Sequence, residues 1–240
     1  MLFRQLFDQD TWTFTYLVAD PDTKAAALVD PVLEQVERDF RLLSELGLTL
    51  EFCLETHIHA DHVTGTGKLR ELTKCQGLVP ENAKAACADR TLQHGEVLNI
   101  GTVAIQAIET HGHTDSHMAY LVNGTHLLTG DSLFIRGCGR TDFQSGDAGT
   151  LYDHITQRLF TLPDDTWVYP GHDYRGHTVS TIGEEKQFNP RFILKDLTGQ
   201  HLRDREGFIR FMNTLNLPNP QKIMEAVPAN EQCGRVGIAI

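Results

Sequence analysis

Four side chains of the kinds that bind transition metals stand close together in one short segment, ETHIHADHVTGTG at Glu55–Gly67. They are His57, His59, Asp61 and His62. Imidazole nitrogens and carboxylate oxygens are common ligands of zinc and iron in proteins. His57 and His59 occupy alternate positions where the chain leaves an expected strand, so both can project toward one metal ion. Asp61 and His62 follow an expected turn and could face a neighbouring position.

Local donors rarely complete a metal site, so further donors are expected where other strands end. Three candidates meet this expectation: His113 in ETHGHTDSH, Asp131 in LLTGDSLF and His172 in WVYPGHDY. Each follows an expected strand and lies in a turn with glycine, which lets backbone segments approach closely. Taken singly, Asp131 could be an ordinary turn residue or a helix N-cap. The combined set predicts a metal centre.

The elements that must position these donors are short strands alternating with helices. In Thr11–Val18, aromatic residues alternate with threonines, which predicts a half-buried strand, and residues 25–30 are its expected hairpin partner. Helical spacing over residues 33–43 predicts a helix that Gly47 ends. Further strands are expected at residues 48–54, 103–108, 117–122, 126–129 and 166–169, and further helices at residues 150–160 and 203–215. Because the strands outnumber the helices yet alternate with them, the pattern favours β-sheets covered by helices.

Length and charge narrow the class of protein. A chain of 240 residues with a formal net charge of −11 fits a single acidic domain, here residues 1–240. It contains no Lys/Arg block, so we expect neither nucleic acid nor an anionic membrane as a partner. Charged residues break up the N-terminal segment, and no apolar run reaches the length of a membrane span. We therefore expect a cytoplasmic protein.

The cysteine pattern predicts free thiols. The five cysteines are odd in number and scattered, and no two are spaced as CxxC. We therefore expect reduced thiols in a cytosol-like compartment, and neither a disulfide framework nor a zinc knuckle. The residues concerned are Cys53, Cys75, Cys87, Cys138 and Cys233.

Taken in order, THIHADH, GHT, GD and PGHD resemble the metal signature of the metallo-β-lactamase superfamily, and the resemblance covers nearly the whole chain. It implies an αββα sandwich, an α/β fold in which two β-sheets pack face to face with helices outside. It also implies that the metal site lies at one edge of the sandwich. The superfamily contains hydrolases, oxygenases and electron-transfer proteins, so the fold alone does not settle the function.

Two branches of this superfamily fit the donors, and the first is glyoxalase II. In those enzymes the full set of donors holds two metal ions, and a hydroxide between the ions attacks a glutathione thioester. The resemblance would assign His57, His59 and His113 to one ion and Asp61, His62 and His172 to the other, with Asp131 bridging.

The second branch is the persulfide dioxygenases, which keep the same motif but bind one Fe(II) per chain. Their ligands fall on His57, His113 and Asp131, a 2-His-1-carboxylate triad that leaves open positions for substrate and O2. Zn2+ could fill such a site but has no accessible redox change to run this reaction. The remaining donors would orient the ligands and hold water; they are His59, Asp61, His62 and His172.

Segments outside the ligands favour the dioxygenase branch. LFIRGCGRTDFQSGDAGTLYDHI, YPGHDYRGHTVSTIGEEKQFNPR and LNLPNPQKIMEAVPAN closely resemble persulfide dioxygenases. Glyoxalase II has lysine where Arg140 stands and carries a helical C-terminal domain, which we do not expect here. His117 in GHTDSH resembles the thioesterase branch instead. We therefore predict oxidation of glutathione persulfide by O2 to sulfite and glutathione, with a glyoxalase II-like hydrolase as the alternative.

Binding of anionic glutathione to an acidic chain requires local cations, because long-range attraction cannot help. Arg140 is the main candidate, since its planar guanidinium suits a carboxylate in two-point contact. Tyr174 is the expected hydroxyl donor on the opposite wall, and Arg191 is a weaker second cation. The other interpretation is that Arg140 pairs with Asp142 or Asp147 and only braces the loop.

A catalytically silent sensing or binding member of the superfamily is a further alternative. Degeneration normally shows as lost ligands, and here every donor position is filled, which counts against it. Cys233 in ANEQCG stands in a context shared with the dioxygenases. It could be a redox-sensitive residue near the substrate entrance, but the sequence favours an ordinary thiol. A homodimer stays open.

Overall fold

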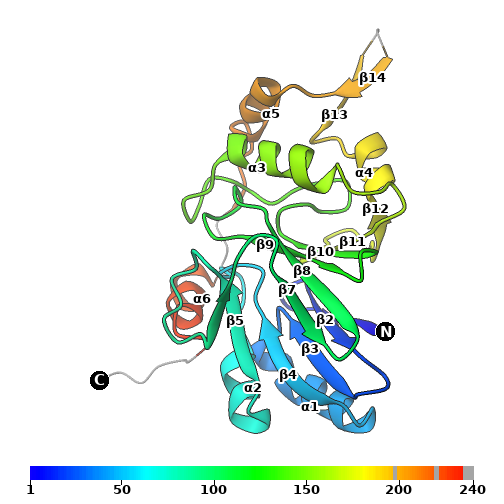
Figure 1. The fold of residues 1–240 in the computed structure, drawn as a ribbon. Helices are drawn as coiled ribbons and strands as arrows, with labels where there is room; N and C mark the ends of the chain where they lie inside the picture. The colour runs from blue at the N-terminus through cyan, green and yellow to red at the C-terminus, as the bar shows by residue number, and fades with distance from the viewer. Residues whose placement is uncertain (197–198, 219–221, 235–240) are drawn as a thin grey trace.

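The computed structural model describes residues 1–196, 199–218 and 222–234 and has four layers. Two six-stranded sheets pack face to face, with strand orders β1-β2-β3-β4-β5-β6 and β12-β11-β10-β9-β8-β7. Helices α1 and α2 cover the outer face of the first sheet, and α3, α4 and α5 lie over the second (Figure 1). The αββα sandwich expected from the sequence is confirmed.

The first sheet begins as an antiparallel hairpin and continues with parallel strands. β1 and β3 pair antiparallel with β2, whereas β4, β5 and β6 add in parallel. Gly47, with a φ of +62°, follows α1 in the left-handed conformation expected at a helix end. The elements are β1 (Leu2–Asp8), β2 (Thr13–Ala19), β3 (Ala25–Val29), α1 (Val36–Glu45), β4 (Thr49–Leu54), α2 (Thr66–Thr73), β5 (Gln76–Pro80) and β6 (Arg90–Leu92).

The second sheet is antiparallel except where β10 pairs in parallel with β11. A small hairpin, β13–β14, forms a separate two-stranded sheet. The elements are β7 (Val97–Ile100), β8 (Val103–Glu109), β9 (Met118–Val122), β10 (His126–Gly130), α3 (Ala148–His154), β11 (Trp167–Pro170), β12 (Ser180–Thr181), α4 (Ile182–Phe188), β13 (Ile193–Asp196), β14 (Gly199–Leu202), α5 (Arg205–Met212) and α6 (Ile223–Asn230).

The main core fills the space between the two sheets. Phe14 and Tyr16 from β2 pack there with Tyr120 from β9. The prediction that β2 is half-buried was wrong, because every residue of this strand is buried. Its threonines can be buried because they have polar partners inside the protein. The Thr15 hydroxyl donates to the carbonyl oxygen of Asp30, and the Thr13 hydroxyl contacts His172, one of the predicted metal donors.

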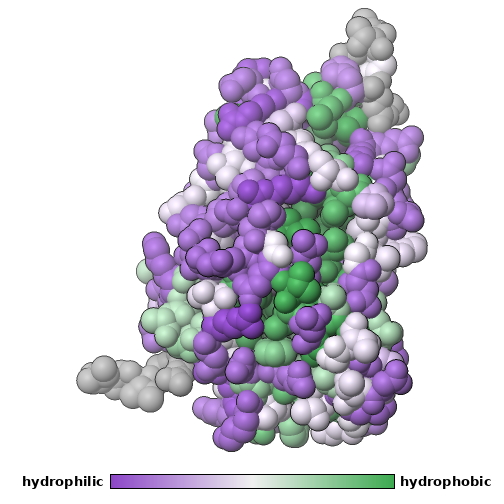
Figure 2. All heavy atoms as spheres, in the orientation of Figure 1, coloured by the Kyte–Doolittle hydropathy of each residue, from purple (hydrophilic) through white to green (hydrophobic). Residues whose placement is uncertain are grey.

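The surface of the molecule is mainly hydrophilic in the view of Figure 2, with a central band of hydrophobic residues that rises from the region of β7 and β8 toward β13. The described part of the chain contains no helix with the length and apolar character needed to cross a bilayer.

The expectation that all cysteines are free thiols was wrong. Cys87, in the loop between β5 and β6, forms a disulfide with Cys233, which follows α6, at a sequence separation of 146. The pattern could not predict this pair, because only the folded chain brings these distant segments together. Cys53, Cys75 and Cys138 are free, as expected, and all three are buried.

Candidate metal centre

Four loops bring the predicted donors to one edge of the sandwich. Each loop leaves the end of a strand, and the strands come from both sheets: β4 belongs to the first sheet, whereas β8, β10 and β11 belong to the second. In chain order these loops carry His57, His59, Asp61 and His62; then His113; then Asp131; and then His172.

The side chains of His57, His113 and Asp131 gather around one point. One potential ligand atom from each lies within 4.8 Å of the others. The His113 Nε2 atom is 3.6 Å from Oδ2 of Asp131, and the rings of His57 and His113 lie 5.0 Å apart. His57 is 2% exposed and Asp131 is 8% exposed, whereas His113 is partly open to solvent. The structure thus brings together the triad that the sequence singles out.

Hydrogen bonds fix the tautomers of the two triad histidines. Nδ1 of His113 lies 2.7 Å from the carbonyl oxygen of Arg140. A carbonyl oxygen only accepts, so Nδ1 carries the proton and Nε2 keeps a lone pair for a metal. The Thr56 hydroxyl donates to Asp30 and therefore accepts from Nδ1 of His57, 2.9 Å away. Both imidazoles thus present Nε2 as a ligand atom, as expected for metal-binding histidines.

Two further histidines hold Asp131. His117, which is fully buried, accepts from the backbone N–H of Asp131 at 3.0 Å through Nε2. Burial above all, with help from His113, holds the pKa of His117 well below its usual range. His172 donates from Nδ1 to Oδ1 of Asp131 at 2.6 Å. The other carboxylate oxygen of Asp131, Oδ2, is left facing the triad.

His172 bridges two carboxylates. Its Nε2 atom lies 2.9 Å from Oδ2 of Asp61 and 3.1 Å from the Thr13 hydroxyl. Both ring nitrogens therefore lie within hydrogen-bond distance of a carboxylate oxygen. Burial alone would lower the pKa of His172, but Asp131 and Asp61 outweigh burial and hold the pKa well above its usual range. His62 also contacts Oδ2 of Asp61, at 2.9 Å through Nδ1.

His59 faces a buried acidic pair that the sequence analysis missed. Its Nε2 donates to Asp30 at 3.0 Å and lies 3.5 Å from Glu55. Asp30 also accepts from the backbone N–H of Thr56. Within the described residues, Nδ1 of His59 and Nε2 of His62 are buried without a hydrogen-bond partner. Those two atoms are therefore available as metal ligands, as the dinuclear alternative requires.

Two glycines, of which Gly171 lies in an expected turn, make room for the triad. A Cβ atom on Gly139 would lie 2.2 Å from the carbonyl oxygen of Asp131 and 2.8 Å from Nδ1 of His113. A Cβ atom on Gly171 would lie 2.6 Å from Oδ1 of Asp131. Side chains cannot occupy these positions without displacing Asp131, so both turns need glycine.

The triad lies in a cleft of about 740 Å3 that contains all three residues predicted to bind substrate. Arg140 makes a two-point ion pair with Asp142, at 2.7 and 2.8 Å, and donates to the carbonyl oxygen of Pro218. Tyr174 is 62% exposed and stacks on His172 with ring centroids 5.9 Å apart. The Arg191 guanidinium lies 5.1 Å from the centre of the Phe211 ring.

The fold and the site agree with the comparisons to known proteins. The family model described as the metallo-beta-lactamase superfamily matches residues 13–172. This stretch holds every donor of the centre, so the chain is a metallo-β-lactamase-fold protein.

Two relatives identify the family within this superfamily to which the chain belongs. It is 45% identical to the human protein named "Persulfide dioxygenase ETHE1, mitochondrial", over 98% of this chain and 89% of the human one. The crystal structure of ETHE1 from Myxococcus xanthus superposes with a TM-score of 0.92 at 49% identity, covering 98% of this chain and 100% of that one. The chain therefore belongs to the persulfide dioxygenase family of the superfamily.

A hydroxyacylglutathione hydrolase from Bradyrhizobium sp. is also similar, at 37% identity, but over 69% of this chain and 64% of the hydrolase. The similarity to the hydrolase is therefore lower and covers less of both chains than the similarity to the human dioxygenase.

Proposed function

We propose that this protein is a glutathione-dependent persulfide dioxygenase. It would hold one Fe(II) per chain through His57, His113 and Asp131, and oxidise the outer sulfur of glutathione persulfide with O2 to give sulfite and glutathione. One observation carries the proposal: in a chain 45% identical to a persulfide dioxygenase, two histidines and one carboxylate converge within 4.8 Å. This donor set fits iron that must keep positions open for two substrates.

The protein's own groups define how such an ion would be held. The Arg140 carbonyl oxygen and the Thr56 hydroxyl orient the two imidazoles, and His172 and His117 orient Asp131. Bound Fe(II) would supply a site for the persulfide sulfur and the redox change that O2 needs. His59, Asp61, His62 and His172 would support the ligands rather than bind the ion.

The glyoxalase II-like alternative would make both His172 and Asp61 ligands of a second ion. Nε2 of His172 lies 2.9 Å from Oδ2 of Asp61, a separation that two ligands of one ion also have. The choice of a single iron is therefore supported by the similarity to the persulfide dioxygenases. The glyoxalase II-like hydrolase stays the alternative function, because His59 and His62 each keep a buried nitrogen without a partner in the described structure. A silent binding member is disfavoured, since every donor is present.

The glutathione moiety would lie along the cleft. Arg140, Tyr174 and Arg191 remain the proposed contacts, and all three line it. A glutathione carboxylate would have to compete with Asp142 and the Pro218 carbonyl oxygen for the Arg140 guanidinium. A single domain over residues 1–240, a cytoplasmic location and the absence of nucleic acid and membrane partners stay predictions from the sequence, and a homodimer stays open.

Anaerobic purification followed by metal analysis and an oxygen-electrode assay tests the proposal. We expect one iron per chain, O2 consumption that requires glutathione persulfide, and sulfite as product. Lactoylglutathione should be hydrolysed poorly or not at all. Two tightly bound zinc ions, no O2 consumption and rapid thioester cleavage would establish the hydrolase instead.

A further inference from the structure

The last residue of α6, Asn230, is bound to the loop that carries four of the metal-type donors. Its side-chain nitrogen donates to the carbonyl oxygens of His59 and His62, at 2.9 and 2.8 Å. Its side-chain oxygen accepts from the backbone N–H of Thr64 at 2.8 Å. Asn230 is 4% exposed. One carboxamide, from 171 residues away in the sequence, thus satisfies three backbone groups of the loop.

The rest of α6 packs closely on the same loop. Ala226 and Ala229 form a small buried cluster with Val63, and Val227 packs against the cluster around Ile58, which stands between two of the histidines. Only a small cavity of about 10 Å3 remains between this turn and the loop.

Two glycines show how tight this contact is. A Cβ atom on Gly67 would lie 2.4 Å from the carbonyl oxygen of Cys233, and one on Gly234 would lie 2.1 Å from that of Thr64. Any shift of this turn is therefore transmitted to the loop.

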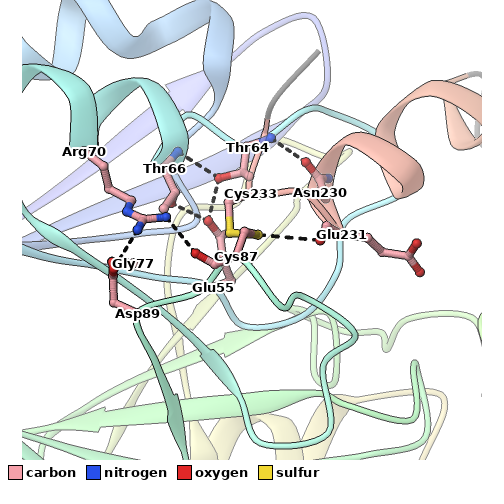
Figure 3. Close-up of a disulfide and its surroundings, with 10 residues drawn as sticks. All are labelled: Glu55, Thr64, Thr66, Arg70, Gly77, Cys87, Asp89, Asn230, Glu231 and Cys233. Atoms are coloured by element: carbon pink, nitrogen blue, oxygen red, sulfur yellow. Dashed lines mark hydrogen bonds and ion pairs between the residues drawn. A yellow bond between two sulfur atoms is a disulfide. The ribbon is translucent and has the colours of Figure 1, made fainter. Parts of the chain in front are cut away.

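The Cys87–Cys233 disulfide fastens this turn to the first sheet, as Figure 3 shows. The Arg70 side chain of α2 donates to the carbonyl oxygen of Cys87 at 2.9 Å and pairs with Asp89 at 2.6 Å. Asp89 in turn accepts from the backbone N–H of Gly77 in β5. These contacts fix the position of the loop that carries Cys87. The disulfide therefore also fixes the position of the end of α6.

We propose that Asn230 is a positioning residue for the metal-binding loop. We also propose that the Cys87–Cys233 disulfide makes this positioning depend on the redox state of the two cysteines. The inference rests on the proposed metal site but not on which metal it holds or which reaction it runs. With the disulfide formed, the end of α6 is fixed and the loop is held in its ligand geometry. With the disulfide reduced, the end of α6 can separate from the loop, and metal is released faster.

The switching chemistry is thiol–disulfide exchange with a low-molecular-weight thiol such as glutathione. A thiolate attacks the sulfur of Cys87, which is half-buried, whereas Cys233 is only 4% exposed. The Cys87–Cys233 bond breaks, a mixed disulfide forms on Cys87, and Cys233 leaves as a thiolate that takes up a proton. A second thiol attacks the mixed disulfide and releases Cys87 as a thiol and the small molecule as its own disulfide. Two thiols are oxidised and one protein disulfide is reduced.

The rate of metal release to a coloured chelator tests the inference, measured anaerobically on Fe(II)-loaded protein with the disulfide intact or reduced by a phosphine. We expect release about ten times faster from the reduced protein, in line with losses of groups that support ligands. Cys87→Ser should release metal at the fast rate under both conditions. The matched control is Cys75→Ser, which removes a buried free thiol and should keep the redox response.

Asn230 variants separate positioning from folding. Asn230→Ala should release metal fast in both redox states while still forming the disulfide, as shown by mass spectrometry. Asn230→Asp keeps an acceptor for Thr64 but loses both donor hydrogens, so it should give an intermediate rate if the alanine variant does not fold. Equal release from oxidised and reduced wild-type protein, or a Cys87→Ser variant that behaves as oxidised wild type, would overturn the inference. A redox-dependent release rate in a protein without dioxygenase activity would overturn the proposed function alone.

Discussion

Nδ1 of His113 donates to the backbone carbonyl oxygen of Arg140 across 2.7 Å. The segment that carries Arg140 therefore has two separable parts at the site. Its main chain orients a candidate metal ligand, and its side chain lines the cleft. A substitution of the side chain leaves the carbonyl group in place, so the two contributions can be measured independently.

Arg140→Ala should therefore keep iron near the wild-type level while substrate binding weakens. A hydrogen bond to a charged group is worth about 1.5–3 kcal/mol, so kcat/KM should fall roughly 10- to 150-fold. Steady-state O2 consumption with glutathione persulfide, beside iron analysis, measures both effects. Asp142→Ala is the control, since it removes the partner that competes for the guanidinium. If Arg140→Ala loses iron or unfolds with KM unchanged, the arginine is structural.

Substitutions of the donors should divide into two groups. His57→Ala, His113→Ala and Asp131→Ala should each lose both iron and activity. His59→Ala and His172→Ala should weaken iron binding only about 10- to 100-fold, as is typical for groups that orient ligands. Metal titrations on the purified variants give these affinities.

His94→Ala is the matched control for this series, because His94 is exposed and lies outside the centre. It should keep iron and activity. Equal losses in both groups of donors would point to a two-metal site and against the triad.

Gly139→Ala should disturb the site through shape alone. The added methyl group would overlap the carbonyl oxygen of Asp131 and the His113 ring, so we expect iron loss together with destabilisation of about 1–3 kcal/mol, as overpacking usually costs. The matched control is Gly137→Ala in the same GCG segment, where a Cβ atom would only reach ordinary contact with Phe134 at 3.5 Å. Chemical denaturation and iron analysis compare the two. Equal iron retention would show that the turn adapts.

Asp20 should make stability depend on acid pH. The Asp20 carboxylate connects a turn of the first sheet to a turn of the second. It accepts hydrogen bonds from the backbone N–H of Thr102 at 2.7 Å and from the Thr102 hydroxyl at 3.0 Å. It also accepts one from the backbone N–H of Asp22. The hydrogen bond from the Thr102 N–H is the largest cause that lowers the pKa of Asp20 to about 2. Because the pKa of Asp20 is lower in the folded protein than in the unfolded chain, where it is about 3.9, the ionised carboxylate stabilises the fold at pH values above about 3.9. This stabilisation is lost as the pH falls toward 2.

Thermal unfolding of metal-free protein between about pH 5 and pH 2 tests this effect. Asp20→Asn should have a lower melting temperature at pH 5 and a smaller further decrease on acidification than wild type. Asp22→Asn, which removes a charge from the same turn, serves as the control. Parallel curves for wild type and Asp20→Asn would show that Asp20 does not contribute.

The sequence could predict the donors because each lies in a loop that follows an expected strand. Asp30 directly follows β3, so the same pattern applies to it. Its φ of 51°, which is rare for a residue other than glycine, is visible only in the structure. Asn230 and Thr13 carry no such signal, because their partners lie in distant segments of the chain. Likewise, the burial of β2 on both faces depends on partners for its threonines, which alternation alone cannot reveal.

The donors of the centre come from both sheets, with His57 after a strand of one and Asp131 after a strand of the other. An ion held by both residues would act as a crosslink between the two halves of the sandwich. Its binding free energy would add to the stability of the docked sheets, because the site cannot exist in either half alone. Hydrogen exchange of amides near the junction should therefore slow on metal loading more than exchange within each sheet. Cells short of the metal would then lose the folded protein as well as its activity.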